Sequence, residues 1–115
     1  MQKQICKSSA VAEGGSVSTA GFGLPNVPTS PMLGEPNRLT IGVYSADNAT
    51  TITAFVSYDN GVTWMAACVR GTDTPASFEL SGGGAGATFE IVPAPNLQLV
   101  SSAACTLTAY ANITN

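Results

Sequence analysis

Few residues in this chain could carry out chemistry, and the first candidates are a pair of carboxylates. Glu79 and Glu90 lie on neighbouring predicted strands, and paired acids about 5 to 9 Å apart can act on a glycosidic bond. The apolar residues on either side of each acid form the inward phase of its strand, which directs both carboxylates to solvent. We therefore expect no catalytic role for this pair.

The sequence offers equally few residues for nucleophilic catalysis, metal binding or phosphate binding. The chain has no histidine, so no serine or cysteine has an imidazole base to activate it. Asp47, Asp59 and Asp73 lie on predicted loops and could offer oxygens to Ca²⁺, but their spacing matches no calcium-binding loop. The glycine-rich residues 82–86 precede no helix, so they are not a phosphate loop. The sequence predicts no catalytic residue, no metal, no cofactor, and hence no enzyme.

The chain contains three cysteines, Cys6, Cys68 and Cys105. They are too few for a closed disulfide framework, and their spacing is not that of metal ligands. We expect three free thiols that behave as small apolar side chains. A bridge between Cys68 and Cys105 is the alternative.

Charge is scarce in this chain. Asp, Glu, Lys and Arg make up 10% of its 115 residues, against about 25% in a typical domain. The exposed surface must therefore be built largely from Ser, Thr, Asn, Gly and Ala. Such a surface suits a protein that neighbours cover, or a robust extracellular or particle-bound β protein.

The same composition argues against several classes of partner. The four basic residues form no cluster and the net charge is −3, whereas nucleic-acid binding relies on several Lys or Arg contacts to phosphates. No apolar run is long enough to span a membrane. The N-terminal residues lack the apolar core of a signal peptide, so we expect a protein made and used without export.

The elements that position these residues are predicted to be strands. From Arg38 onward, apolar and polar residues alternate with a period of two, the pattern of half-buried strands. We expect strands at residues 38–46, 50–58, 62–70, 78–80, 89–91, 97–99 and 105–111. Short strands separated by turns predict a single all-β domain over residues 38–115, a β-sandwich or jelly-roll-like fold of about 7–8 antiparallel strands.

Residues 1–37 differ from the remainder. Four prolines fall between residues 25 and 36, and prolines lack the donor that a strand ladder needs. We predict an extended Pro/Gly-rich N-terminal arm, with one short strand at 16–22, that lies on a neighbouring subunit; a surface loop is the alternative. The apolar residues that would anchor this arm are Phe22, Leu24, Val27, Met32 and Leu33.

One turn has a recognisable sequence. Ser57-Tyr-Asp59-Asn-Gly61-Val-Thr-Trp64 matches the Asp-box pattern S/T-x-D-x-G-x-T-W, which is found on hairpins of sialidases and related β proteins. Asp59 can accept bonds from backbone N–H groups of the turn, Gly61 supplies a positive φ, and Trp64 is expected beneath the hairpin as a large part of the core. The box stabilises a hairpin and is not catalytic. The chain is too short, and its two arginines too few, for a sialidase.

The second half of the chain has a familiar layout. The Asp-box hairpin is followed by Phe89-Glu-Ile91-Val-Pro93-Ala-Pro95, then Leu97-Gln-Leu99-Val-Ser-Ser, and an alternating final strand. This layout resembles the small β-sandwich structural proteins of tailed bacteriophages, especially capsid decoration (cement) proteins. The resemblance implies a virion protein without catalytic residues, assembled in the host cytoplasm as a trimer or dimer. It would bind the major capsid protein or other virion proteins and lock them with an N-terminal arm.

Two further functions stay open. One is a head–tail or tail component of the virion; the other is a carbohydrate- or receptor-binding β-sandwich module. A sugar platform needs aromatic side chains together on one outer face, and only Tyr44 and Tyr110 fall in the outward phase of their strands. Trp64 falls in the inward phase, which weakens the sugar-binding alternative.

Overall fold

The computed structural model describes residues 2–18, 38–91 and 94–114, and these residues form strands and turns without any helix. None of them therefore provides a helix that could cross a membrane. The strands are β1 (Gln2–Val11), β2 (Ser16–Ser18), β3 (Arg38–Ser45), β4 (Thr50–Ser57), β5 (Met65–Ala66), β6 (Ser77–Leu80), β7 (Ala85–Ile91), β8 (Asn96–Ser101) and β9 (Cys105–Thr114). The predicted all-β class is confirmed.

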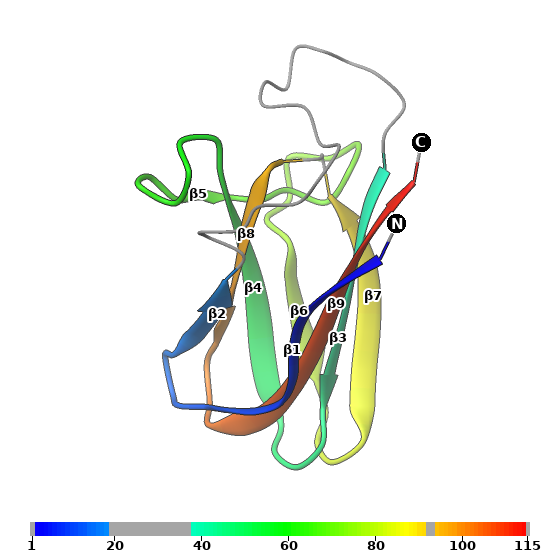
Figure 1. Ribbon diagram of the computed structural model, residues 1–115. Coiled ribbons are helices and arrows are strands. Elements are labelled where there is room, and N and C mark those ends of the chain that lie inside the picture. Colours follow the sequence, from blue (N-terminus) through cyan, green and yellow to red (C-terminus); the bar gives the residue numbers. More distant parts are fainter. Residues whose placement is uncertain (1, 19–37, 92–93, 115) are drawn as a thin grey trace.

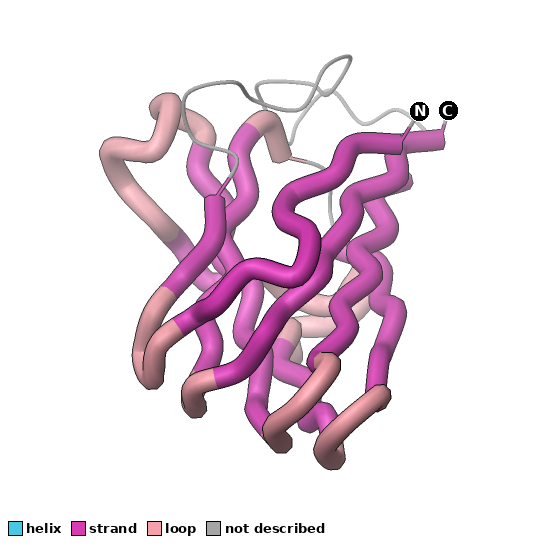
Figure 2. Tube along the Cα trace, turned by 60° about the horizontal axis from the view of Figure 1, so that its bottom comes forward, coloured by secondary structure: helices cyan, strands magenta, loops and turns pink. Residues whose placement is uncertain are grey.

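The strands form two antiparallel sheets that face one another as a sandwich (Figure 1). The first sheet has the order β1-β9-β3-β7. The second has the order β2-β8-β4-β5, and β6 also pairs with β4. The connections β1–β2, β3–β4, β6–β7 and β8–β9 cross between the sheets at one end of the molecule, and Figure 2 shows these turns gathered there.

The core lies between the sheets and is built from the inward phase of the strands. The largest apolar side chains that are fully buried there are Leu39, Ile41, Ile52, Ile91, Leu97, Leu99 and Leu107. The predicted inward phases of β3, β4, β7, β8 and β9 are thereby confirmed. Phe78 of β6 stacks on Phe89 of β7 with ring centroids 4.2 Å apart, which ties the two sheets together at one side.

The predicted boundary between an arm at 1–37 and a domain at 38–115 is wrong for the described part of the first segment. β1 pairs with β9 from Gln2↔Asn112 to Val11↔Cys105, and β2 pairs with β8. Val11 is 6% exposed and belongs to the core. Two register shifts in β1 break its period of two, so the sequence does not read as a strand.

The remainder of the predicted arm, residues 19–37, lies outside the described residues. The anchors expected there, Phe22, Leu24, Val27, Met32 and Leu33, therefore stay a prediction. Only the first part of the strand expected at 16–22 is described, and it is β2.

The turn after β4 contains the predicted bond from a backbone N–H to Asp59, and Ser57 adds further bonds. The Ser57 hydroxyl donates to Asp59 Oδ1 at 2.7 Å and accepts from the backbone N–H of Gly61 at 2.9 Å. Asp59 Oδ1 also accepts from the backbone N–H of Thr63 at 2.8 Å. Gly61 has the expected positive φ of 87°. Side chains, not a neighbouring strand, therefore satisfy the backbone of this turn.

Those bonds explain why the prediction for residues 62–70 is wrong. Side chains accept hydrogen bonds from the N–H groups of the turn, so strand pairing begins again only at the short strand β5. Val62 is 81% exposed, Trp64 is only half-buried, and Ala67 is the buried residue. The residues that the sequence pattern places inward in this segment are therefore not the buried ones. Trp64 does not form the centre of the core.

Asp47, in the β3–β4 turn, plays a similar part at the other end of β4. Its Oδ1 accepts from the backbone N–H of Thr106 at 2.8 Å, and its Oδ2 accepts from the Thr106 hydroxyl at 2.8 Å. These bonds lower the pKa of the Asp47 carboxyl. The bonds to Asp59, with that from the Ser57 hydroxyl the strongest, lower the pKa of its carboxyl to about 2.

We expect the free energy of unfolding to fall as the pH drops below about 4. A carboxyl whose pKa is lower in the folded state than its unfolded value of about 3.9 stabilises the fold above that unfolded value. That contribution is lost as the pH falls towards the folded pKa, which is about 2 for Asp59. Urea midpoints measured at about pH 5 and about pH 2.5 test this expectation.

The double variant Asp47→Asn/Asp59→Asn should have a lower midpoint at the higher pH and a smaller decline on acidification. Asp73→Asn, on an exposed loop, serves as the matched control. A double variant whose midpoint declines as steeply as that of the parent protein would contradict the assignment.

Candidate binding surface

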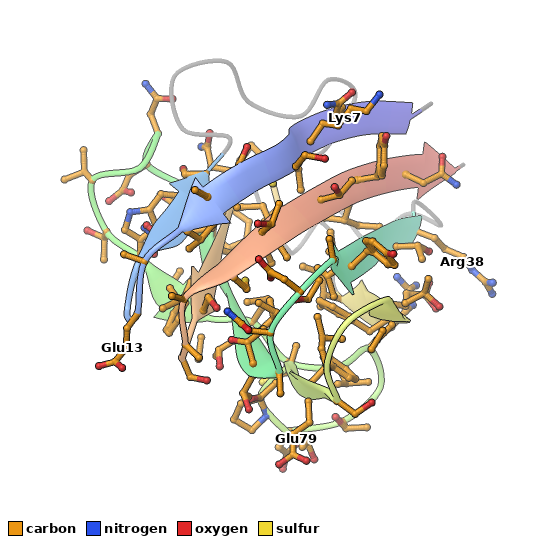
Figure 3. All side chains as sticks on the ribbon, turned by 90° about the horizontal axis from the view of Figure 1, so that it is seen from below. Lys7, Glu13, Arg38 and Glu79 are labelled. Atoms are coloured by element: carbon orange, nitrogen blue, oxygen red, sulfur yellow. The ribbon has the colours of Figure 1, made fainter. Side chains whose placement is uncertain are left out.

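The outer face of the four-stranded sheet carries little charge and contains a hollow. Figure 3 shows Lys7, Glu13, Arg38 and Glu79 pointing outward at separate places around the molecule. The hollow has a volume of about 430 Å³ and is lined by Gly42, Val43, Tyr44, Gly86, Ala87, Thr88, Thr108 and Tyr110. None of these residues is charged. The site can therefore recognise a ligand by shape and hydrogen bonding only.

Strand register creates this hollow. Six outward positions on β7, β3 and β9 lie side by side in two rows, because alternate residues of a strand share one face. The first row is formed by Thr88, Gly42 and Tyr110, and the second by Gly86, Tyr44 and Thr108. The two outward tyrosines that the sequence singled out are thus diagonal neighbours across β3 and β9.

Tyr44 lies directly opposite Gly86, and Tyr110 lies directly opposite Gly42, but only Tyr44 covers its glycine. A Cβ on Gly86 would lie 3.5 Å from Tyr44 Cδ2, so the Tyr44 ring packs over this glycine. Such packing is a common structural use of an aromatic residue in a sheet. A Cβ on Gly42 would approach only Thr88 Cγ2, at 3.8 Å, among the described residues. Gly42 therefore stays uncovered and forms the floor of the hollow.

The two glycines also differ in whether the fold requires them. A Cβ on Gly86 would lie 2.9 Å from the backbone oxygen of Val43, so this position admits no side chain. Gly42 has no such clash and no positive φ. Glycine within a strand costs about 0.5–1 kcal/mol relative to alanine. The fold would accept a side chain at position 42, and its absence keeps the hollow open.

Beside the hollow, β7 is a long and regular edge strand. Proteins normally protect sheet edges with short strands, bulges, charges or prolines. β2 and β5 are very short, β1 contains register shifts, and β6 carries the exposed Glu79. β7 pairs with β3 over its whole length without a shift, contains neither proline nor lysine, and carries its one charged residue, Glu90, only next to its last residue. Among the described strands, β7 is thus the edge with the least protection.

The end of β7 near Ile91 is covered. Glu90 Oε2 lies 3.6 Å from Arg38 Nε and 3.7 Å from Arg70 Nε, and the backbone N–H of Arg70 donates to the Glu90 carbonyl at 2.8 Å. That last bond also shows that the backbone of Glu90 points away from β3. In an antiparallel edge strand the backbone direction alternates, so Thr88 and Gly86 also present their N–H and C=O groups to the open side.

The structure does not bring the candidate chemical residues together. Glu79 is exposed on the second sheet, whereas Glu90 lies on the first, with the stacked pair of phenylalanines between the sheets. Asp47 and Asp59 lie at opposite ends of β4. In the described part of the chain, no three Asp, Glu, Cys or His side chains gather closely enough to hold a metal ion.

The three cysteines are free thiols in the structure. Cys105 is buried, as expected for a small apolar residue, and Cys6 and Cys68 are half-buried. The Cys6 thiol donates to the Leu107 carbonyl at 3.4 Å, and its partial burial raises its pKa. The alternative of a bridge between Cys68 and Cys105 is not what the structure contains.

Sequence reasoning found the two outward tyrosines but missed the floor between them. The signal was Gly42, a lone glycine inside an otherwise regular strand pattern, which marks a bulge or a close approach to the backbone. Its meaning depends on which residues lie beside it on β7 and β9. That information is absent from any one strand.

Comparisons with protein-family models and with curated sequences identify no relative. No protein-family model matches the chain, and no curated protein sequence matches it significantly. Its function must therefore be inferred from the sparsely charged outer face, the hollow over Gly42 and the least protected part of the β7 edge.

Proposed function

We propose that this chain is a non-enzymatic structural protein of a tailed-phage virion, a decoration (cement) protein that binds and stabilises the capsid lattice. The observation that carries the proposal is the edge of β7 over residues 85–88, the least protected edge among the described strands. An exposed edge of this kind can accept a strand from another chain. In an assembly, a neighbouring subunit supplies that strand.

The scarcity of charge supports the same proposal. A free protein usually relies on charged side chains for solubility, and only 10% of the residues here are charged. A subunit held in a particle needs fewer charges, because neighbours cover part of its surface. The partners in this proposal are the major capsid protein or other virion proteins, together with further copies of this chain in a trimer or dimer. Nucleic acid and membranes are not among them.

The edge can be tested by one substitution that removes its hydrogen bonding without disturbing the sheet. Thr88→Pro deletes an N–H that points away from β3, and proline is tolerated on the free side of an edge strand. Thr88→Val keeps the N–H and is the matched control. Light scattering measures the native mass of each protein, alone and with empty capsids from which the protein has been stripped.

We expect the parent protein and Thr88→Val to form an oligomer and to bind capsids. Thr88→Pro should remain folded by circular dichroism, and its assembly should weaken by about tenfold or more, which corresponds to about 1.4 kcal/mol. A parent protein that is monomeric and ignores capsids at micromolar concentration would overturn the proposal. Equal assembly of both variants would exclude β7 as the contact.

A further inference from the structure

We propose that the hollow over Gly42 is a binding site for one pyranose ring of a neutral glycan. This site lies on the outer face of the sheet, whereas the edge of β7 offers backbone groups in the plane of the sheet, although residues 86–88 take part in both. The site adds a recognition function to the structural one. The proposal rests on the uncovered floor at Gly42, on the tyrosines that border it, and on the chemistry of its lining.

The shape of the hollow suits a single sugar ring. Its volume of about 430 Å³ is typical of small-ligand sites, which range from about 300 to 1,000 Å³. The floor is the flat backbone of a central strand, left bare because Gly42 has no side chain and Tyr110 does not reach over it. Tyr44, packed over Gly86, forms part of the border. A pyranose presents a face of C–H groups that packs against flat, apolar surfaces of this kind.

The polar groups around the floor match the hydroxyls on the rim of a sugar. Tyr110 contributes a phenol group that both donates and accepts, and Thr88 and Thr108 contribute hydroxyls. The Tyr44 ring contributes apolar border only, because its hydroxyl lies beside Gly84, 3.7 Å from where a Cβ on that glycine would be. The Thr108 oxygen already accepts from the backbone N–H of Ser8 at 2.9 Å, which leaves its own O–H to donate to a ligand.

The absence of charge selects a neutral glycan over other occupants. An anionic sugar would lose hydration here without gaining a cation, because no lining residue is charged. Glu90, farther along β7, is already paired with Arg38 and Arg70. An aliphatic side chain of a protein partner would find an apolar floor but would leave the surrounding hydroxyls without partners. A neutral sugar can pack its C–H face against the apolar floor and hydrogen-bond to the surrounding hydroxyls.

The test uses a panel of neutral oligosaccharides, namely cellotriose, chitotriose and N-acetyllactosamine, with digalacturonate as a charged comparison. Amide chemical shifts of the ¹⁵N-labelled full chain are recorded during each titration. We expect at least one neutral sugar to bind with a Kd in the millimolar range or tighter. The largest shifts should fall on Gly42, Thr88 and Tyr110, and digalacturonate should bind at least tenfold more weakly.

Two substitutions assign the binding to the hollow. Gly42→Val fills the floor at a position without a backbone clash, so binding should fall by at least tenfold while the melting temperature is maintained or rises. Tyr110→Ala removes part of the border, and it keeps the proposal testable should the valine variant fold poorly. Thr40→Val is the control, because it lies on the same face of β3 outside the lining.

The outcomes separate this proposal from the structural one. Gly42→Val leaves the edge of β7 intact, so its oligomeric state and capsid binding should equal those of the parent protein. The glycan site is overturned if no neutral sugar in the panel shifts these amides at about 10 mM, or if Gly42→Val binds as well as Thr40→Val. Shifts that map to another part of the surface would likewise overturn it.

Discussion

A chain that lacks residues 1–18 should fail to fold. The deletion removes β1, which pairs along β9, and β2, which pairs with β8, so both sheets lose an edge strand. It also removes Val11 from the core and exposes the flank of β9, whose inward residues are fully buried or nearly so. Circular dichroism and amide spectra of the truncated chain should show an unfolded or aggregated protein.

Two variants separate this effect from a general sensitivity of the N-terminal segment. Val11→Asp places a charge at a position that is 6% exposed and should destabilise the fold severely. Serine at all five predicted anchors, Phe22, Leu24, Val27, Met32 and Leu33, should leave the melting temperature nearly unchanged and weaken capsid binding. A truncated chain with a cooperative transition near that of the parent protein would restore the original assignment of residues 1–37 as a dispensable arm.

Leu107→Ala should lower the free energy of unfolding by about 2–5 kcal/mol, the usual cost of a large-to-small substitution in a packed core. Leu107 is fully buried on β9, between β1 and β3 in the first sheet. The substitution opens a cavity between the sheets, and the surrounding strands can close it only in part. Urea unfolding measures the change, with an unchanged m-value as the sign of an intact fold.

Trp64→Ala is the informative comparison. The sequence pattern placed Trp64 in the core, where its loss would cost about 3–5 kcal/mol. In the structure this side chain is half-buried beside an exposed turn, so the cost should be clearly smaller than that of Leu107→Ala. Leu107→Met conserves volume and should cost less than about 1.5 kcal/mol. If Trp64→Ala proved the more damaging variant, the phase of the β5 region would have to be reversed.

The glycan site and the β7 edge place different demands on the same sheet. Gly42 leaves the middle of β3 without a side chain, and β7 beside it is the least protected edge among the described strands. Both features are liabilities for an isolated domain, since the first weakens a strand and the second invites association. Under the two proposals above, the edge would accept a strand from a neighbouring subunit and the bare floor would accept a ligand.

The sequence by itself determined the all-β class and the inward phase of the regular strands. In β3, β4 and β8, and in β9 as far as Ala111, one face of the strand is buried, so apolar and polar residues alternate in the sequence. The hydrogen bonds of the Asp box were also predictable, because they join residues within one turn. Tyr44 and Tyr110 could be placed on an outer face for the same local reason.

Only the tertiary structure decided which strands lie side by side and what they create together. β1 was hidden because its register shifts break the alternation, and pairing with the distant β9 is what makes it a strand. The floor of the hollow arises where Gly42 meets Thr88 on one side and Tyr110 on the other, and these three residues are far apart in the chain. The alternation of apolar and polar residues along one strand indicates which face of the sheet each side chain lies on. Neighbours across a sheet depend on the register between distant strands, which the packing of the whole core sets.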